Sequence, residues 1–202
     1  MLYAWHNIGD KNSKTKLSPD GTSLKKTYDV FISYAHEDHE WVTEELVPKL
    51  EKEHQFKCCF HERDFQIGVT VMQNIVNCVD KSQVFVVVLT PSYVNSTWCM
   101  FELFLAQSRL NSNAQAEKSR ENAARSSALK QQSNSQNLII IVKQSIDKTA
   151  ISRIDKKMQM TLKLWTYLEW PVKSNPDCKN GFWQKLATCV HNSLNHHYQS
   201  IV

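Results

Sequence analysis

Short apolar runs alternate along this chain with segments whose apolar residues recur at helical spacing. The runs are rich in β-branched and aromatic residues and lack polar alternation, which is typical of strands covered on both faces. Five strands are predicted on this basis, at 30–32, 56–60, 83–89, 138–142 and 164–170. Helices are predicted at 41–53, 70–80, 97–110 and 146–160 and after Gly181.

Strand and helix alternate about five times, which predicts an α/β fold with a parallel sheet and helices on both of its faces. The flavodoxin-like doubly wound order is the economical topology for a five-stranded parallel sheet. The first strand is expected at its centre, with a polar loop at the carboxyl edge and Asp38 as the N-cap of the next helix. Pro48 is expected to kink or interrupt that helix.

Two stretches do not fit this alternation of strands and helices. Residues 1–27 hold Tyr3 and Trp5 followed by a polar, lysine-bearing stretch, which indicates either a flexible tail or a juxtamembrane segment. Residues 111–137 are almost all small, polar or charged, and predict a mobile surface insertion. The folded domain is therefore expected to span 28–202.

Composition excludes several functional classes. A formal net charge of +4 without an arginine-rich stripe does not indicate nucleic-acid binding. The four glycines form neither a Gly-x-Gly-x-x-Gly motif nor a Walker-type loop, so no phosphate-binding loop is predicted. No apolar run is long enough to span a bilayer.

The six cysteines contain no Cys-x-x-Cys pair and are interpreted as free thiols in a reducing compartment. The more specific hypothesis is a metal site that uses His36, His39 or His61. Because these residues lack the usual spacing of ligands, no metal is expected.

Three motifs follow one another at a regular spacing. They are Tyr28-Asp-Val-Phe-Ile-Ser-Tyr34, the loop Arg63-Asp-Phe-Gln-Ile-Gly68, and Gly181-Phe-Trp183. Together they resemble the three signature boxes of Toll/interleukin-1 receptor (TIR) domains. Thr166-Tyr-Leu-Glu-Trp-Pro171 is similar to the segment before the third box in the Toll-like receptor branch that includes receptors one, two and six.

The resemblance implies an innate-immune signalling module that binds TIR-domain adaptor proteins and other TIR domains and forms homo- or hetero-oligomers on activation. It implies a place at the cytoplasmic face of a membrane, through a helix upstream of this chain, or in the cytosol if the chain is complete. No cofactor and no nucleic acid is implied. The residues expected to build the first and third boxes are Tyr28, Asp29, Phe31, Ser33, Phe182 and Trp183.

The second motif has two interpretations. It is either a solvated connection that an arginine–aspartate pair keeps in order, or a protruding recognition loop on a rigid sheet. The resemblance favours recognition, because the motif matches the BB loop of TIR domains. The residues expected to bind partners are Arg63, Asp64, Phe65, Gln66, Ile67, Gly68 and Val69. Many Toll-like receptors have proline before the glycine, so the stiffening that proline gives is absent at Ile67.

Glu102 suggests a second function. It is the only acidic residue between Asp80 and Glu117, and it matches the catalytic glutamate of TIR domains that cleave NAD. Such chemistry needs a carboxylate beside the ribose to stabilise an oxocarbenium-like transition state. The alternative hypothesis is therefore an NAD-cleaving enzyme with NAD as substrate, and it requires Glu102 to border an open cleft. The binding hypothesis instead requires an exposed Ile67.

Overall fold

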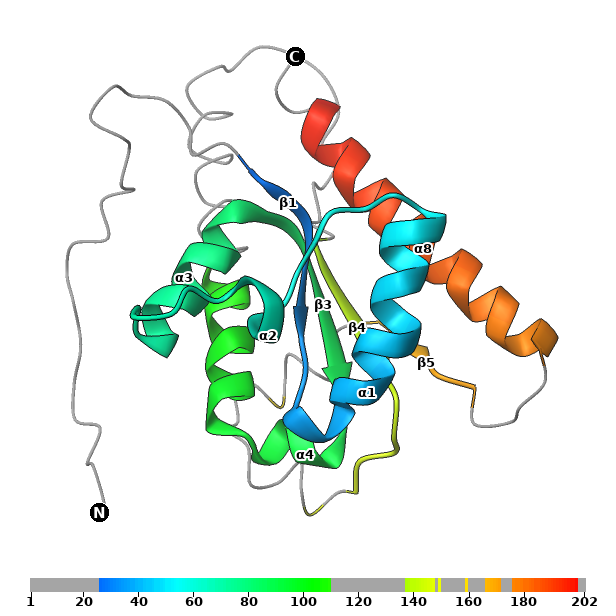
Figure 1. Ribbon diagram of the computed structural model, residues 1–202. Helices are drawn as coiled ribbons and strands as arrows, with labels where there is room; N and C mark the ends of the chain where they lie inside the picture. Colours follow the sequence, from blue (N-terminus) through cyan, green and yellow to red (C-terminus); the bar gives the residue numbers. More distant parts are fainter. Residues whose placement is uncertain are drawn as a thin grey trace, which may run out of the picture.

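The computed structural model describes residues 26–109, 137–147, 149, 159, 166–171 and 176–199. Within these residues a single sheet has the strand order β2-β1-β3-β4-β5, and every neighbouring pair is parallel (Figure 1). The strands are β1 (Tyr28–Ser33), β2 (Cys58–Cys59), β3 (Ser82–Leu89), β4 (Leu138–Val142) and β5 (Tyr167–Glu169). The predicted flavodoxin-like α/β fold is confirmed.

The longest strand holds the centre of the sheet. β3 pairs with β1 from Ser82 to Val87 and with β4 from Phe85 to Leu89. β1 lies between β2 and β3, so it is an interior strand, but β3 is the middle one. Six of the eight residues of β3 form an apolar run without alternation, and only the middle of a sheet covered on both faces buries such a run completely.

Helices cover both faces of the sheet. One group comprises η1 (His36–Asp38), α1 (His39–Trp41), η2 (Val42–Leu46), η3 (Lys49–Glu53) and α8 (Pro176–Gln199). The other comprises α3 (Val71–Lys81), α4 (Pro91–Asn95) and a helix through 97–109, whereas the short α2 (His61–Asp64) follows the edge strand β2. Figure 1 shows α1 and α8 on one side of the strands and α3 on the other.

Alternate residues of the strands supply two separate apolar layers. Val30, Ile32 and Val86 pack in one layer with residues of η2 and α8, and Phe31 and Val87 pack in the other with residues of α3 and α4. Each fully buried side chain of this size contributes about 1.5–3 kcal/mol. This two-sided burial makes the sheet the rigid base from which the loops project.

Several elements differ from the sequence prediction. α4 was missed, although Thr90 accepts a hydrogen bond from the Tyr93 backbone N–H at 3.2 Å and Pro91 occupies the first turn, which is a typical helix start. α8 begins at Pro176, so Gly181 lies inside the last helix and not before it. The predicted strand 56–60 is reduced to two residues.

Pro48 does not end the first long helix. It keeps helical backbone angles (φ −59°, ψ −37°), and the wide turns of a π-helix lie on either side of it. Proline has no N–H to donate to the preceding turn, and the helix adapts to this by widening its turns rather than by breaking.

Three predictions fall mainly on residues outside the described ranges: the N-terminal segment 1–27, the insertion 111–137 and the helix 146–160. They stay predictions, as does the domain boundary of 28–202. None of the helices in the described part of the chain is both long and apolar enough to cross a membrane.

A buried ion pair ties together the carboxyl ends of β1, β3 and β4. Asp38 stands at the N-cap position of α1, but its side chain makes no cap hydrogen bond, contrary to the prediction. Its carboxylate instead accepts hydrogen bonds from Lys143 Nζ at 2.8 Å and Thr90 Oγ1 at 2.7 Å. The Asp38 side chain is 3% exposed and that of Lys143 16%. A buried charge is tolerated when it is paired and hydrogen-bonded in this way.

Replacing Lys143 by Met should lower the free energy of unfolding by about 3 kcal/mol, because the Asp38 carboxylate would stay buried without its cation. Urea unfolding followed by circular dichroism measures the change. Lys179→Met is the matched control: both ammonium groups lie over a tryptophan ring, at 5.5 Å for Lys143 and 5.1 Å for Lys179. Lys179 pairs only with the exposed Glu45, so its loss should cost less than about 1 kcal/mol. Equal losses in the two variants would contradict this account of the pair.

Candidate functional site

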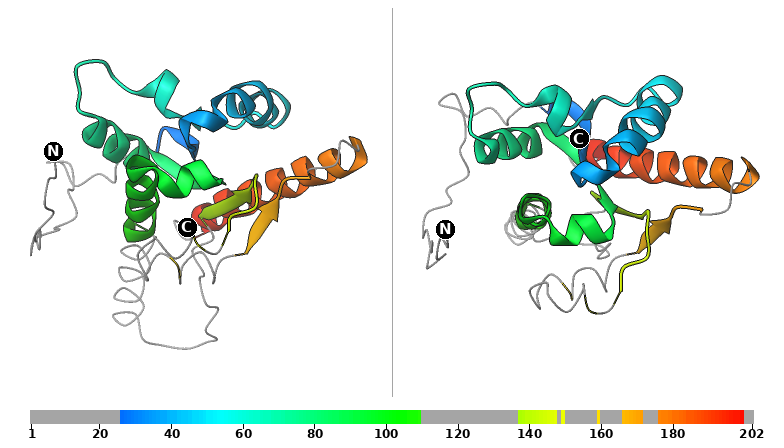
Figure 2. Two further views of the ribbon diagram at one scale, coloured as in Figure 1. Left: turned by 90° about the horizontal axis from the view of Figure 1, so that it is seen from below. Right: turned by 60° about the horizontal axis from the view of Figure 1, so that its bottom comes forward.

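The loop between α2 and α3 projects from the edge of the domain, away from α8 in both views of Figure 2. At its tip the backbone N–H of Val69 donates to the carbonyl of Gln66 at 3.4 Å, and Gly68 has φ +83°. A left-handed residue at the third position is the mark of a type II turn, which favours glycine there and proline at the second position. Ile67 occupies that second position, so the departure from the family pattern falls where proline would fix φ.

Arg63 anchors the base of this loop to the domain. Its guanidinium pairs with the Glu51 carboxylate of η3 at 2.9 Å and donates to the backbone carbonyl of Cys58. It also lies over the Phe60 ring, 4.5 Å from the centroid. The hydrogen bond with Glu51 raises the pKa of Arg63 above its usual value. Arg63 is therefore engaged by its own domain, as expected of a residue that orders the turn.

Asp64 and Phe65 also attach the base of the loop to the domain. The Asp64 carboxylate accepts the backbone N–H of Phe60 at 3.0 Å and contacts Arg63 Nε at 3.2 Å. Phe65 is partly buried against the apolar layer that holds α3. The segment 61–64 is a helical turn, α2, where the sequence predicted an open loop. The base of the loop thus has a fixed geometry, as the interpretation of the motif as an ordered connection requires.

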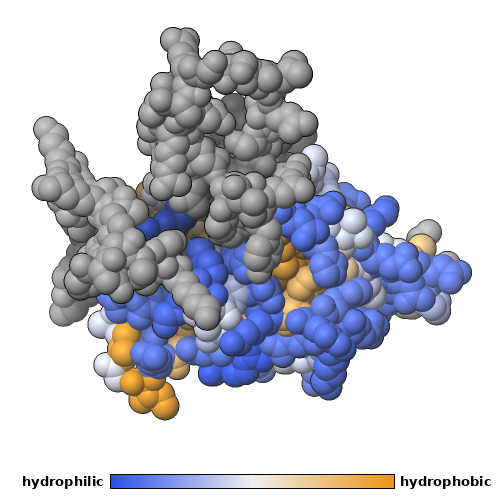
Figure 3. Space-filling view, turned by 90° about the horizontal axis from the view of Figure 1, so that it is seen from above, coloured by the Kyte–Doolittle hydropathy of each residue, from blue (hydrophilic) through white to orange (hydrophobic). Residues whose placement is uncertain are grey.

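The tip carries the exposed apolar surface. The side chain of Ile67 is fully exposed, and Val71 and Met72 at the start of α3 are 45% and 41% exposed. Figure 3 shows an apolar projection at the lower left of a largely hydrophilic face, on the side where Figure 1 places α3, and a second apolar area to the right of the centre. Exposed apolar side chains gathered in this way are typical of an interaction site.

Asn74 also contacts the loop, which the sequence analysis did not predict. It lies on α3 and is 4% exposed, and its carboxamide bonds to the backbone of Gln66 and Val69 on the other side of the tip. The sequence did contain a signal for this contact: Asn74 is a polar residue next to Ile75 on the apolar face of a predicted helix.

Residues of the first box lie in or next to the core. The Asp29 carboxylate accepts the Lys57 backbone N–H at 2.8 Å, just before β2. Phe31 packs edge-on against Phe85, with ring centroids 6.2 Å apart. Tyr28 is only partly buried, beneath the ammonium group of Lys57 at 5.6 Å. These contacts align β1 with its two neighbouring strands.

Residues of the third box belong to an aromatic cluster that joins α8 to the sheet. Phe182 and Trp183 are buried and pack at 5.0 and 5.2 Å between ring centroids on Trp170, which follows β5. Trp41 of α1 completes the cluster, 5.0 Å from Trp170. Both box residues thus lie where an anchor of the last helix is expected.

Glu102 is buried at the carboxyl end of β1. It is 6% exposed, and it accepts a hydrogen bond from the hydroxyl of Ser33, the first-box residue that ends β1. The Ser33 oxygen lies 2.8 Å from the hydroxyl of Tyr93, which donates to the carbonyl of Cys99 at 3.0 Å. Burial raises the pKa of Glu102 to about 8, and the bond from Ser33 only partly opposes this. The carboxyl group is therefore mostly protonated near neutral pH and points into the domain.

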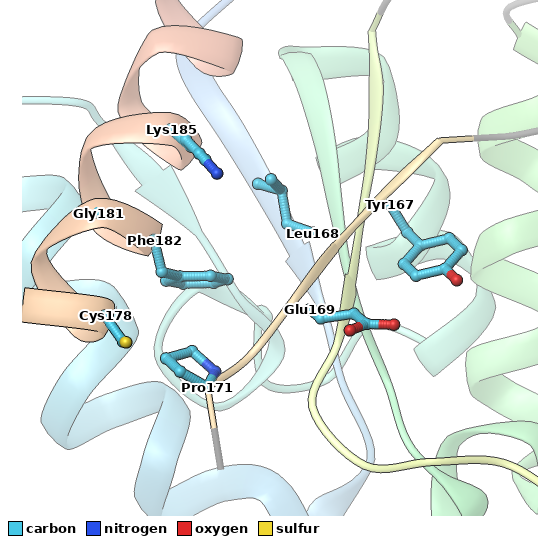
Figure 4. A pocket seen from close by; sticks show the side chains of 8 residues that line it. All are labelled: Tyr167, Leu168, Glu169, Pro171, Cys178, Gly181, Phe182 and Lys185. Atoms are coloured by element: carbon cyan, nitrogen blue, oxygen red, sulfur yellow. The ribbon is translucent and has the colours of Figure 1, made fainter. Parts of the chain in front are cut away.

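A cavity of 540 Å³ lies elsewhere, between β5 and α8 (Figure 4). Tyr167, Leu168, Pro171 and Phe182 are among the residues that line it. Neither Glu102 nor any residue of the α2–α3 loop lines this cavity.

The three histidines considered as metal ligands all lie around Glu62. The distances from the Glu62 carboxylate are 3.7 Å to His36, 2.6 Å to His39 and 3.6 Å to His61. Burial lowers the pKa of His61. Within the described ranges, no three or more side chains of His, Cys, Asp or Glu are arranged to hold a metal ion.

A family model described as "TIR domain" matches residues 30–117. The chain is 34% identical over 168 residues to Toll-like receptor 6 of Bos taurus and 32% identical over 191 residues to Toll-like receptor 2 of Canis lupus familiaris. This chain belongs to the TIR domain family. The alignments cover 83% and 94% of this chain but only 18% and 21% of those receptors, so the TIR chain spans about a fifth of their length.

A solved structure agrees with this assignment. The crystal structure of the TIR domain of the Toll-related receptor TRR-2 from Hydra magnipapillata is similar, with a TM-score of 0.57 and 25% sequence identity. The match covers 82% of this chain and 99% of the Hydra chain. The strand order of the present TIR domain is thus that of its family.

The stability of this TIR domain should fall as pH rises between about 4.3, the usual value for glutamate, and about 8, the folded pKa of Glu102. In this range the folded protein holds one more proton than the unfolded chain, so the free energy of unfolding drops by up to about 1.4 kcal/mol per pH unit. Glu102→Gln is neutral at every pH and should remove this slope. Urea unfolding from about pH 5 to pH 8.5 measures it.

The exposed Glu44 provides the control for this experiment. Glu44→Gln should keep the wild-type slope, because its carboxylate is hydrated in both states. A wild-type profile that runs parallel to that of Glu102→Gln would show that Glu102 is ionised in the folded domain.

Proposed function

We propose that this TIR domain is the signalling module of an innate-immune receptor and acts by associating with other TIR domains, including those of adaptor proteins. The observation that carries the proposal is the fully exposed Ile67 at the tip of a loop whose base is bonded to the domain. An apolar side chain in this position costs free energy in water and recovers it when a partner covers it.

The contrast between the fixed base of the loop and its exposed tip supports this proposal. Arg63 and Asp64 hold the base, so little conformational entropy is lost there when a partner binds. Ile67, Val71 and Met72 then present an apolar surface from two adjoining segments, the turn and the first turn of α3. A small apolar centre with polar surroundings is the usual composition of an interface core and its rim.

Such a surface supports weak contacts between single domains. A tip of three apolar side chains buries less area than a stable interface requires. Association would then depend on clustering, since tethering many copies in one place raises their effective concentration. Similarity to Toll-like receptors 2 and 6 supports a ligand-driven receptor as the source of clustering, with the domain at the cytoplasmic face of a membrane.

Ile67→Asp should reduce association of the domain at least tenfold, because the carboxylate would have to lose its water at the centre of the interface. The measurement is binding of soluble domain to domain clustered on a biosensor surface. The thermal midpoint should stay unchanged, since the side chain contacts only water.

Phe104→Asp is a suitable comparison, because Phe104 is half-exposed on the helix 97–109 and not on the loop. It should leave association within about twofold of wild type if the loop carries the contact. An Ile67→Asp variant that binds as well as wild type would remove the loop from the proposal.

The alternative, an NAD-cleaving enzyme, can be tested on the same clustered sample. Wild type should release no more nicotinamide from NAD than Glu102→Ala, because a buried and mostly protonated carboxyl group supplies no negative charge to an oxocarbenium-like transition state. Release that depends on Glu102 would make this domain an NAD nucleosidase and scaffolding its secondary role.

A further inference from the structure

The recognition loop lacks the residue that would stiffen its turn. At the second position of a type II turn, proline fixes φ and reduces the number of unfolded conformations. Ile67 provides no such restraint, and Gly68 beside it is the most permissive residue of all. Some other contact must hold the turn if its tip is to present Ile67 in one direction.

We propose that Asn74 is the positioning residue of this loop, and that its carboxamide does the work that a proline would do at position 67. This inference deepens the proposed function, since it names the residue that presents the apolar tip to a partner. It rests on three hydrogen bonds that join α3 to the two residues flanking Ile67 and Gly68.

The three bonds engage both polar atoms of the carboxamide. The Asn74 oxygen accepts the backbone N–H of Gln66 at 2.9 Å. Its nitrogen donates to the carbonyl of Gln66 at 3.0 Å and to the carbonyl of Val69 at 3.4 Å. An amide side chain has one acceptor oxygen and two N–H donors, and here each of the three has a backbone partner.

Only an amide can do this at position 74. Gln66 offers a donor and an acceptor side by side, and the carboxamide matches both at once. A carboxylate could accept the Gln66 N–H but would set its second oxygen against the carbonyls of Gln66 and Val69. A hydroxyl has one donor and cannot serve both carbonyls together.

The three hydrogen bonds are shielded from water and start from a well-ordered helix. Asn74 is 4% exposed, so water competes little for its polar atoms. Its own backbone is held in α3, where its N–H donates to the carbonyl of Thr70 at 3.0 Å. Thr70 is the N-cap of that helix and accepts the backbone N–H of Gln73 at 3.2 Å. The turn is therefore fastened to the end of a capped helix.

The direct test is the mobility of the loop, which needs no partner. In ¹⁵N relaxation of the isolated domain, Asn74→Ala should lower the backbone order parameter at Gly68 from about 0.85 to below about 0.6. The Gln66 amide, freed from the Asn74 oxygen, should exchange with solvent at least about tenfold faster. Asn74→Asp should behave like Asn74→Ala, since it restores only one of the three bonds.

Gln73→Ala is the matched control. Gln73 precedes Asn74 on the same helix and also has a carboxamide, but it is exposed and bonds only within α3, to Asn77 Oδ1 at 2.8 Å. Its removal should leave the order parameters of the loop unchanged. Protection of the α3 amides, compared among the variants, separates a loosened loop from a frayed helix.

The second measurement links the loop to recognition. On the clustered-domain surface, Asn74→Ala should weaken association by about fivefold to tenfold, although Ile67 is still present, because the loosened loop would now lose conformational entropy when a partner binds. Gln73→Ala should bind as wild type does.

The outcomes separate this inference from the proposed function. Unchanged order at Gly68 in Asn74→Ala overturns the inference, whatever happens to association. Loss of order with unchanged association overturns the role of Asn74 in recognition and leaves only its role in holding the loop. Whether the loop is the partner surface is decided separately by Ile67→Asp.

Discussion

The parallel pairing of β1 with β3 is the constraint on which the rest of this structure depends. It aligns Ser33 with Val87, so that both strands end at one edge of the sheet. The loops that follow must then share that edge. Asp38, from the loop after β1, meets Thr90 at the end of β3 and Lys143 just after β4. A single buried charged group thus joins three strand ends, whereas its polar neighbours His36, Glu37 and Glu40 are exposed.

The same edge explains the position of Glu102. The helix 97–109 must cover the second apolar layer, and this brings its first turns over the end of β1. Glu102 then points at Ser33. The hydroxyls of Ser33 and Tyr93 continue this chain of hydrogen bonds to the backbone carbonyl of Cys99. The position that matches a catalytic residue in other TIR domains is here part of a closed hydrogen-bonded network.

The loop between α2 and α3 shows how an exposed apolar tip can stand on a small domain. Arg63 joins the loop to η3 and to the backbone of Cys58, and Asn74 joins its far side to α3. Between these two attachments only a short turn is free of side-chain anchors. The domain therefore presents its fully exposed Ile67 on an element whose base and sides are fixed, which favours brief contacts that many clustered copies can reinforce.

The sequence by itself determined the fold class, because apolar runs and helical periodicity are local signals that survive without tertiary context. Its three motifs indicated the family by their resemblance to the boxes of TIR domains, and they located the loop between α2 and α3. The sequence could not determine the burial of Glu102, whose partner Ser33 is 69 residues away, or the Asp38–Lys143 pair, whose members are 105 residues apart. Asn74 and Gln66 are only eight residues apart, yet a helix start lies between them. Contacts of this kind follow from how the helices pack on the sheet, so only the tertiary structure decided which polar residues are buried and which of them hold the loop.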